Sequence, residues 1–190
     1  MDSVFSNTPA VATGETVAQI IAACRSKFTS IHGMKGTTED DILGAFQDRV
    51  RWHGAPEEVG SDDAAVYKGH RFTNYCRDLY ISLWQSEAYH QNQNYAENVW
   101  ETFKRGTNRM LDFTGAPASW WLLAALLFAQ IWNHTVDANL GDGTRSPYMV
   151  ASGRGDDISP YICYSFYEPV YARVFDNTSF PSECKEVCCQ

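Results

Sequence analysis

The sequence predicts an α/β fold, in which a mixed sheet carries helices on both faces. Along the chain, short apolar segments typical of strands alternate with segments whose apolar residues recur at helical spacing. Hydrophobic residues make up 44% and aromatic residues 14% of the 190 residues, which suffices for the core of one domain. The sequence shows no internal repeat and no low-complexity segment that would favour another architecture.

The first elements are expected to be two paired strands and a helix. Residues 16–24 and 27–34 are rich in Val, Ile, Ala and Phe, which favours strands. Thr38 followed by Asp41 predicts a helix start, because the two side chains can cap each other's backbone. The His-Gly-Ala-Pro segment at 53–56 predicts the end of this helix.

The middle of the chain again alternates strands with helices. Residues 57–61 and 81–84 predict short strands, and the segment 69–79 between them predicts a helix. After a polar segment, a further helix is expected to start at a cap on Asn94 and to end near Asp112. This order supports a mixed sheet with helices on both faces.

A tryptophan-rich segment follows, and it raises the question of a membrane span. Residues 113–136 contain no Asp, Glu, Lys or Arg. However, the apolar centre at 120–132 is shorter than the roughly 20 residues that a span needs, and Gln130 and Asn133 add polar groups. The segment therefore predicts a helix in the core or at a self-interface, with Pro117 near its first turn, and no membrane partner.

The C-terminal region is expected to be partly irregular. We assign residues 1–153 to the main domain and residues 154–190 to a C-terminal extension. The aromatic segment 161–174 is expected to form a strand pair on the core. The six cysteines show no zinc-binding spacing with the five histidines and indicate reduced thiols. Those of the tail are expected in a disordered terminus: Cys184, Cys188 and Cys189.

Three acidic residues form a candidate metal site. Asp62 follows a predicted strand, Glu97 starts a predicted helix thirty-five positions later, and Asp2 is a possible third ligand. Phosphodiester chemistry commonly uses divalent metals that acidic side chains hold. Taken singly, Asp62 is explained as a turn residue and Glu97 as a first-turn residue that the helix dipole favours. Asp63 is an alternative to Asp62.

Five short motifs occur in one order along the chain. They are Asp-Ser-Val-Phe-Ser at Asp2, Ser-Asp-Asp at Asp62, Gln-Asn-Tyr-Ala-Glu ending at Glu97, Trp-Asn-His-Thr at 132–135 and Arg-Ser-Pro-Tyr-Met-Val-Ala-Ser-Gly at 145–153. Together they resemble the integrase catalytic core of copia-type retrotransposon polyproteins, in the retroviral integrase superfamily. The resemblance covers nearly the whole chain.

This resemblance implies a fold, a site and a reaction. The fold is ribonuclease H-like, with a mixed five-stranded sheet whose first strand is truncated. Asp2, Asp62 and Glu97 match the D,D-35-E triad, which holds two Mg²⁺ (or Mn²⁺) ions for DNA strand transfer. The implied partners are element DNA ends, target DNA and further copies of the chain. The implied location is intracellular, in the nucleus or in a cytoplasmic virus-like particle.

Two departures from the family pattern lower the expected activity. The chain starts one residue before Asp2, and no His/Cys zinc module precedes it, so we expect a polyprotein fragment. With no strand before it, Asp2 is expected to be poorly fixed, which would weaken metal binding and joining.

Four polar or basic residues near Glu97 are candidate DNA contacts. Gln91 and Asn92 offer amides, and Lys104 and Arg105 offer positive charges on the predicted helix. The alternative is a solvated loop and a solvated helix face on which Glu101 pairs with Arg105.

The formal net charge of −8 counts against a DNA-binding protein, because phosphate contacts need basic surface. A non-catalytic, degenerate or domesticated integrase-fold interaction domain therefore remains an alternative to the enzyme. So does a nuclease of the same fold, because the triad alone does not choose between water and a 3′-hydroxyl as the nucleophile.

Overall fold

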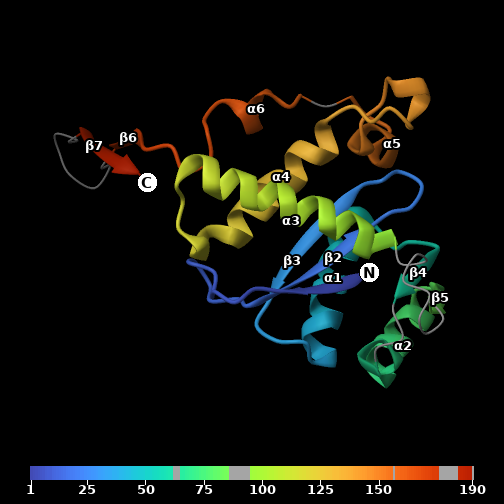
Figure 1. The fold of residues 1–190 in the computed structure, drawn as a ribbon. Helices are drawn as coiled ribbons and strands as arrows, with labels where there is room; N and C mark the ends of the chain where they lie inside the picture. Colours follow the sequence, from blue (N-terminus) through green and yellow to red (C-terminus); the bar gives the residue numbers. More distant parts are fainter. Residues whose placement is uncertain (62–64, 86–94, 156, 176–183, 190) are drawn as a thin grey trace.

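The computed structural model describes residues 1–61, 65–85, 95–155, 157–175 and 184–189, with side chains for residues 1–61, 65–84, 95–155 and 157–170. Figure 1 shows how these segments are arranged. The elements are, in order, β1 (Asp2–Phe5), β2 (Val17–Ala22), β3 (Thr29–Met34), α1 (Glu39–His53), β4 (Glu58–Ser61), η1 (Ala65–Lys68), α2 (His70–Asp78), β5 (Ser82–Gln85), α3 (Tyr95–Thr114), η3 (Ala118–Trp120), α4 (Trp121–His134), η4 (Gly141–Gly143), α5 (Pro147–Ser152), α6 (Ser159–Ile162), β6 (Val170–Phe175) and β7 (Cys184–Cys189).

A three-stranded antiparallel sheet and a two-stranded parallel ladder make up the central layer. Strands β1, β2 and β3 are antiparallel neighbours, with Asp2 opposite Ile20. Strands β4 and β5 run parallel, with Gly60 opposite Trp84. The Met1 amino group donates a 2.6 Å hydrogen bond to the Gly60 carbonyl, so the ladders meet where β1 lies beside β4. The two sheets lie side by side and together give five strands of mixed direction, which agrees with the mixed α/β fold that the sequence predicted.

Helices cover both faces of this sheet, because side chains along each strand alternate between the faces. We call the two resulting sets of buried residues the α1/α2 core and the α3/α4 core. Members of the α1/α2 core include Val17, Met34, Ile42, Phe46, Val59, Phe72, Cys76 and Ile81. Members of the α3/α4 core include Val4, Ala18, Ile20, Ile31, Val99, Phe103, Leu122 and Ala125.

Helices α1 and α2 are coupled through their N-terminal ends. Thr38 caps α1 as predicted, because its hydroxyl accepts from the Asp41 amide while Asp41 accepts from the Thr38 amide. The adjacent Glu39 carboxylate accepts hydrogen bonds from the amides of Arg71 (2.7 Å) and Phe72 (3.0 Å) in the first turn of α2. A residue at the start of one helix therefore satisfies the free amides of the next.

Helices α3 and α4 pack closely on the other face of the sheet. A β-carbon built on Gly106 of α3 would lie 2.2 Å from the Phe128 ring of α4, so only glycine allows this approach. Phe103 meets Phe128 edge-on at a centroid distance of 5.1 Å. Helix α4 is the core helix that the tryptophan-rich segment predicted, and no described helix has both the length and the apolarity for crossing a bilayer.

Asn133 joins the end of α4 to the start of β3. Its amide oxygen accepts from the Thr29 amide at 2.9 Å, and its amide nitrogen donates to the Thr29 carbonyl at 2.7 Å. Both residues are buried. The motif at 132–135 therefore has a structural role in this chain.

A buried polar group connects β1, β2 and η1. Ser3 Oγ donates to Gln19 Oε1 at 2.9 Å, and Gln19 Nε2 donates to the Tyr67 hydroxyl at 3.0 Å. Gln19 is 0% exposed and Tyr67 is 3% exposed. We call these three residues the buried polar triad. It holds β1 against the segment that follows β4.

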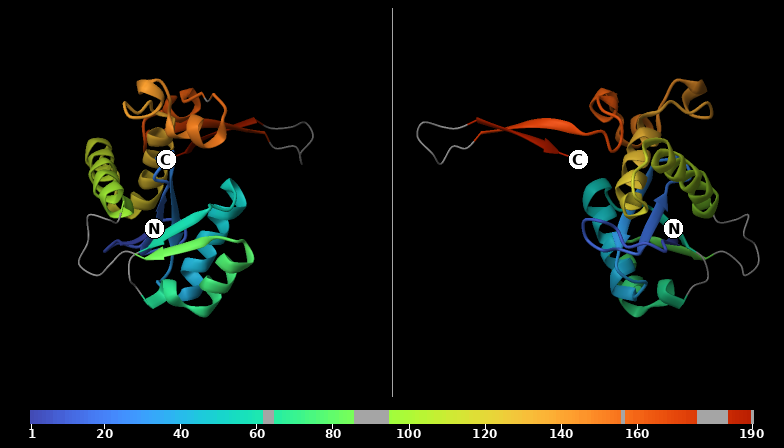
Figure 2. Two further views of the ribbon diagram at one scale, coloured as in Figure 1. Left: turned by 90° about the vertical axis from the view of Figure 1, so that its right-hand side faces the viewer. Right: turned by 60° about the vertical axis from the view of Figure 1, so that its left-hand side comes forward.

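Two expectations about the chain ends were wrong. Residues 2–5 form strand β1, so pairing with β2 fixes the backbone of Asp2. The segment 161–174 does not form a strand pair within itself: it begins inside α6, and β6 pairs with β7, the cysteine-containing segment 184–189 expected to be disordered. The β6–β7 ribbon projects away from the three layers (Figures 1 and 2). The division between 153 and 154 stays a prediction.

Replacing Asn133 with Ala is expected to lower the free energy of unfolding by about 2 to 4 kcal/mol, because two buried backbone groups of Thr29 lose their partner. Urea denaturation measures this change. Gln130→Ala, at an exposed position of the same helix, is the control and should stay within about 0.5 kcal/mol of the original chain. Equal effects of the two changes would contradict the role of Asn133.

Substitutions in the buried polar triad should be non-additive. Gln19→Leu and Tyr67→Phe should each cost about 1 to 3 kcal/mol, because each removes one end of the buried hydrogen bond between Gln19 and Tyr67. The double variant should cost clearly less than the sum, because it removes both partners. Denaturation of all four chains tests this expectation, and strictly additive costs would show that the two side chains are not coupled.

Candidate active site

Three element ends meet at one edge of the molecule. They are the start of β1, the end of β4 and the start of α3 (Figures 1 and 2). The Met1–Gly60 hydrogen bond joins the first two. The third is placed by packing, since Ala96 of α3 and Val4 of β1 both belong to the α3/α4 core. This edge therefore brings together the elements that carry or precede the three predicted acids.

Asp2 is half-buried on the sheet face that α3 covers. Met1 belongs to the α1/α2 core and Val4 to the α3/α4 core, so the alternation along β1 places Asp2 on the side of Val4. Its Oδ1 accepts a 2.8 Å hydrogen bond from the Ser3 amide. The orientation of Asp2 is thus tied to the residue whose hydroxyl joins the buried polar triad.

Asp62 and its alternative Asp63 lie outside the described residues. The structure describes what precedes them, namely β4 ending at Ser61, which is 7% exposed. Asp62 is the next residue in the sequence and is two positions from Gly60, where the two ladders meet. Its predicted role stays a prediction. Gln91 and Asn92 also lie outside the described residues, so their predicted DNA contacts stay untested.

Glu97 lies in the first turn of α3. It is half-buried, between the buried residues Ala96 and Val99. An acidic residue in a first turn is also favourable for the helix itself, because the amides at that end carry partial positive charge. The position therefore agrees with a metal ligand and with the structural alternative.

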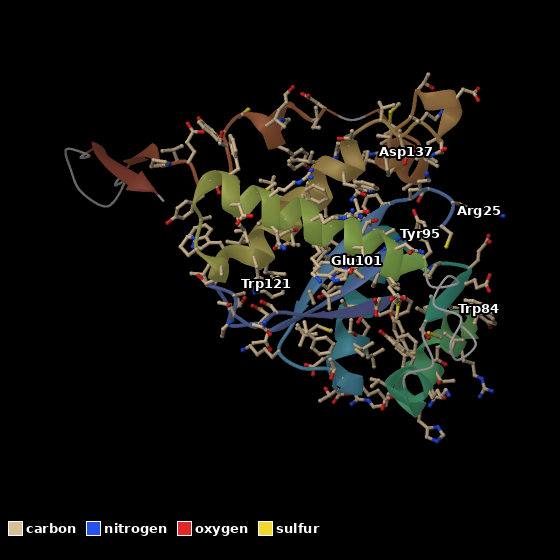
Figure 3. The ribbon with its side chains drawn as sticks, viewed as in Figure 1. Arg25, Trp84, Tyr95, Glu101, Trp121 and Asp137 are labelled. Atoms are coloured by element: carbon tan, nitrogen blue, oxygen red, sulfur yellow. The ribbon has the colours of Figure 1, made fainter. Side chains whose placement is uncertain are left out.

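Tyr95 precedes Glu97 at the start of α3 and is packed against the α3/α4 core. Burial raises the pKa of its hydroxyl, and Cys24 and Asp137 raise the pKa further. Asp137 holds Lys27 through an ion pair of 3.2 Å, which fixes the β2–β3 turn beside the loop after α4. Figure 3 shows Tyr95 and Asp137 among the labelled residues around this end of α3.

Lys104 and Arg105 are exposed on α3. The Arg105 Nε donates to the backbone carbonyl of Glu101 at 3.2 Å, so the contact between these two residues runs through the backbone. This bond differs from the predicted pairing, which joined Arg105 to the Glu101 carboxylate. Both cationic groups remain at the surface, where a phosphate could reach them.

Among the described residues, no group of three or more His, Cys, Asp and Glu side chains could hold a metal ion. Asp2 and Glu97 supply two of the three predicted carboxylates, and the third falls at Asp62. A surface hollow of about 550 Å³ lies away from the candidate acids, between β3, α1 and Leu126 of α4. It is lined by Asp40, Asp41 and Asp48 and shares no residue with the candidate acids.

The sequence interpretation missed the support behind the acids. Ser3, Gln19 and Tyr67 were not singled out, although a glutamine within the apolar segment 17–22 is a signal of a buried polar contact. It also missed Trp84, an indole that is 44% exposed on β5. An exposed tryptophan cannot be told from a buried one by composition alone.

No protein-family model matches the chain, and no curated protein sequence matches it. Solved structures do match. The HTLV-2 integrase catalytic core domain in complex with magnesium, in its trimeric form, gives a TM-score of 0.58 at 15% identity, over 79% of this chain and 92% of that chain. The BIV integrase catalytic core domain gives 0.55 at 18% identity, over 80% and 90%.

A larger assembly gives a similar result. The simian T-cell lymphotropic virus intasome in complex with PP2A regulatory subunit B56 gamma gives a TM-score of 0.64 at 13% identity, over 92% of this chain and 61% of that chain. At these identities the likeness concerns the fold. The chain therefore has the ribonuclease H-like fold of retroviral integrase catalytic cores.

Proposed function

We propose that this protein is the catalytic core of a copia-type retrotransposon integrase, which joins a 3′-hydroxyl of element DNA to a target strand. One observation carries the proposal. Asp2 on β1 and Glu97 on α3 belong to elements that meet at the end of β4, one residue before Asp62, in a fold shared with integrase cores. The copia assignment is supported by the order of the five sequence motifs.

The donor set suits a magnesium or manganese ion. Carboxylate oxygens are the hard ligands that these cations prefer, and Asp2 and Glu97 offer them from two separate elements. Asp62 would be the third ligand. A solved relative is a complex with magnesium. When bound, a divalent pair activates the attacking oxygen and stabilises the leaving oxygen of the phosphodiester.

Several residues of the chain hold the candidate metal ligands in place. Pairing with β2 and the bond from the Ser3 amide restrict the Asp2 carboxylate. The buried polar triad holds β1 against η1, which follows Asp62 in the sequence. Packing of Ala96 and Val99 holds the first turn of α3, and with it Glu97. Such support matters because a metal site requires its ligands to be held to within about 0.5 Å.

The proposed partners are element DNA ends, target DNA and further copies of this chain. The relatives support this, since HTLV-2 cores were solved in dimeric and trimeric forms and one relative belongs to an intasome. Lys104 and Arg105, together with Gln91 and Asn92, are the proposed DNA contacts. We place the protein inside the cell, in the nucleus or in a cytoplasmic virus-like particle.

A non-catalytic interaction domain is the second candidate. The formal net charge of −8 favours it, because it opposes the approach of DNA. The two candidates differ in what the acids do. Only the enzyme requires the carboxylates of Asp2, Asp62 and Glu97 to act together.

Glu97→Gln should weaken Mn²⁺ binding at least about ten-fold and abolish strand transfer from a pre-cut element end, because the amide cannot supply the negative charge. Calorimetry measures the binding and a gel-based joining assay measures the transfer. Glu101→Gln, one turn further along α3 and exposed (Figure 3), is the matched control. Unchanged Mn²⁺ binding in Glu97→Gln, or equal losses in both variants, would contradict the assignment of Glu97.

Replacing Lys104 and Arg105 together with Gln should weaken binding to duplex DNA and reduce the slope of log K against log salt by about 2, because roughly two phosphate contacts are lost. Fluorescence anisotropy at several salt concentrations gives the slope. Arg51→Gln on α1, an exposed basic residue on the other side of the sheet, should leave the slope unchanged. A slope unaffected by the double change would remove these residues from the DNA contact.

A further inference from the structure

Trp84 is a large apolar side chain that stays 44% exposed on the short strand β5. It lies opposite Gly60 in the parallel β4–β5 ladder. A β-carbon built on Gly60 would come within 3.2 Å of the indole carbon Cε3. The ring therefore lies against the bare backbone of Gly60, the residue whose carbonyl accepts the bond from Met1.

The indole lies on the same sheet face as Asp2. Val59 and Ile81 belong to the α1/α2 core, so Gly60 and its partner Trp84 point to the opposite face. That opposite face is the one on which Val4 and Asp2 lie. Trp84 and Asp2 thus lie on the same face of the sheet.

Strand spacing gives the scale of this arrangement. Neighbouring strands are about 4.8 Å apart, and Trp84 is two strands from Asp2, so their backbones are separated by roughly 10 Å. This separation is short enough for one strand of DNA to contact both residues. Figure 3 shows Trp84 and Tyr95 at the same side of the view, near the start of α3.

We propose that Trp84 is a stacking platform for a nucleobase of single-stranded DNA next to the candidate acids. This inference rests on the proposed function and extends it by naming the form of DNA and the residue that holds it. The net charge of −8 limits what phosphate contacts can contribute to affinity. Stacking on an aromatic ring supplies affinity without a positive charge, and it accepts any base, because every base has a π-face.

The test uses single-stranded DNA of about twelve nucleotides with 2-aminopurine at its 3′ end, in a buffer containing EDTA. Binding to the chain should quench the 2-aminopurine fluorescence. Trp84→Ala should weaken binding between about five-fold and a hundred-fold and remove the quenching, and Trp84→Phe should retain most of both. Circular dichroism checks that each variant is folded.

Trp52→Ala is the matched control. Trp52 is 73% exposed near the end of α1, the helix on the other face of the sheet, and its removal should leave binding and quenching unchanged. A second control replaces the 2-aminopurine nucleotide with an abasic one. Trp84→Ala should then cause no further loss of affinity, because the base that it stacks on is already missing.

Three results would overturn the inference. They are equal losses in Trp84→Ala and Trp52→Ala, a loss in Trp84→Ala that is the same with and without the base, and no binding of the single strand by the original chain. Because EDTA removes divalent metals, the result does not depend on catalysis. Trp84-dependent quenching without any strand transfer would contradict the proposed function and leave this inference standing. Strand transfer without an effect of Trp84→Ala would contradict this inference and leave the proposed function standing.

Discussion

The seam between β1 and β4 is the constraint on which the rest of this structure depends. The antiparallel ladder and the parallel ladder meet through the bond from Met1 to Gly60. Ser3, Gln19 and Tyr67 reinforce the seam from the side of α1 and α2, where fully desolvated polar atoms are costly unless they are paired. Loosening this seam would move β4 relative to β1, and with it the end of β4 relative to Asp2.

The layer of α3 and α4 fixes the position of Glu97. Gly106 lets α3 approach the ring of Phe128, and Asn133 ties the far end of α4 to β3. Glu97 is therefore carried by a helix that is held along its length and at its start. The same layer ends short of β5, where Trp84 remains open to solvent. A rigid support beside an open aromatic surface is a suitable arrangement for a flexible polymeric substrate.

Much of the fold could be predicted from local signals. Thr38 with Asp41, the Gly-Ala-Pro break at 54–56 and the apolar segments gave strands β2 to β5 and helices α1 to α4 correctly, because capping and burial act over a few residues. The site was harder. The pairing of β1 with β2 and of β6 with β7 depends on segments that are distant in the sequence. The periodicity of a single segment carries no information on such partners. Gln19 and Trp84 showed the same limit, since burial and exposure are properties of the assembled sheet.

The Asn133 contact has a consequence for how the sequence motifs are interpreted. Asn133 serves folding through two buried hydrogen bonds, and Ser146 likewise caps α5 just before Pro147. These two motifs therefore serve the fold, whatever the chemistry of the chain. Under the proposed function, only Asp2, Asp62 and Glu97 would report on DNA joining.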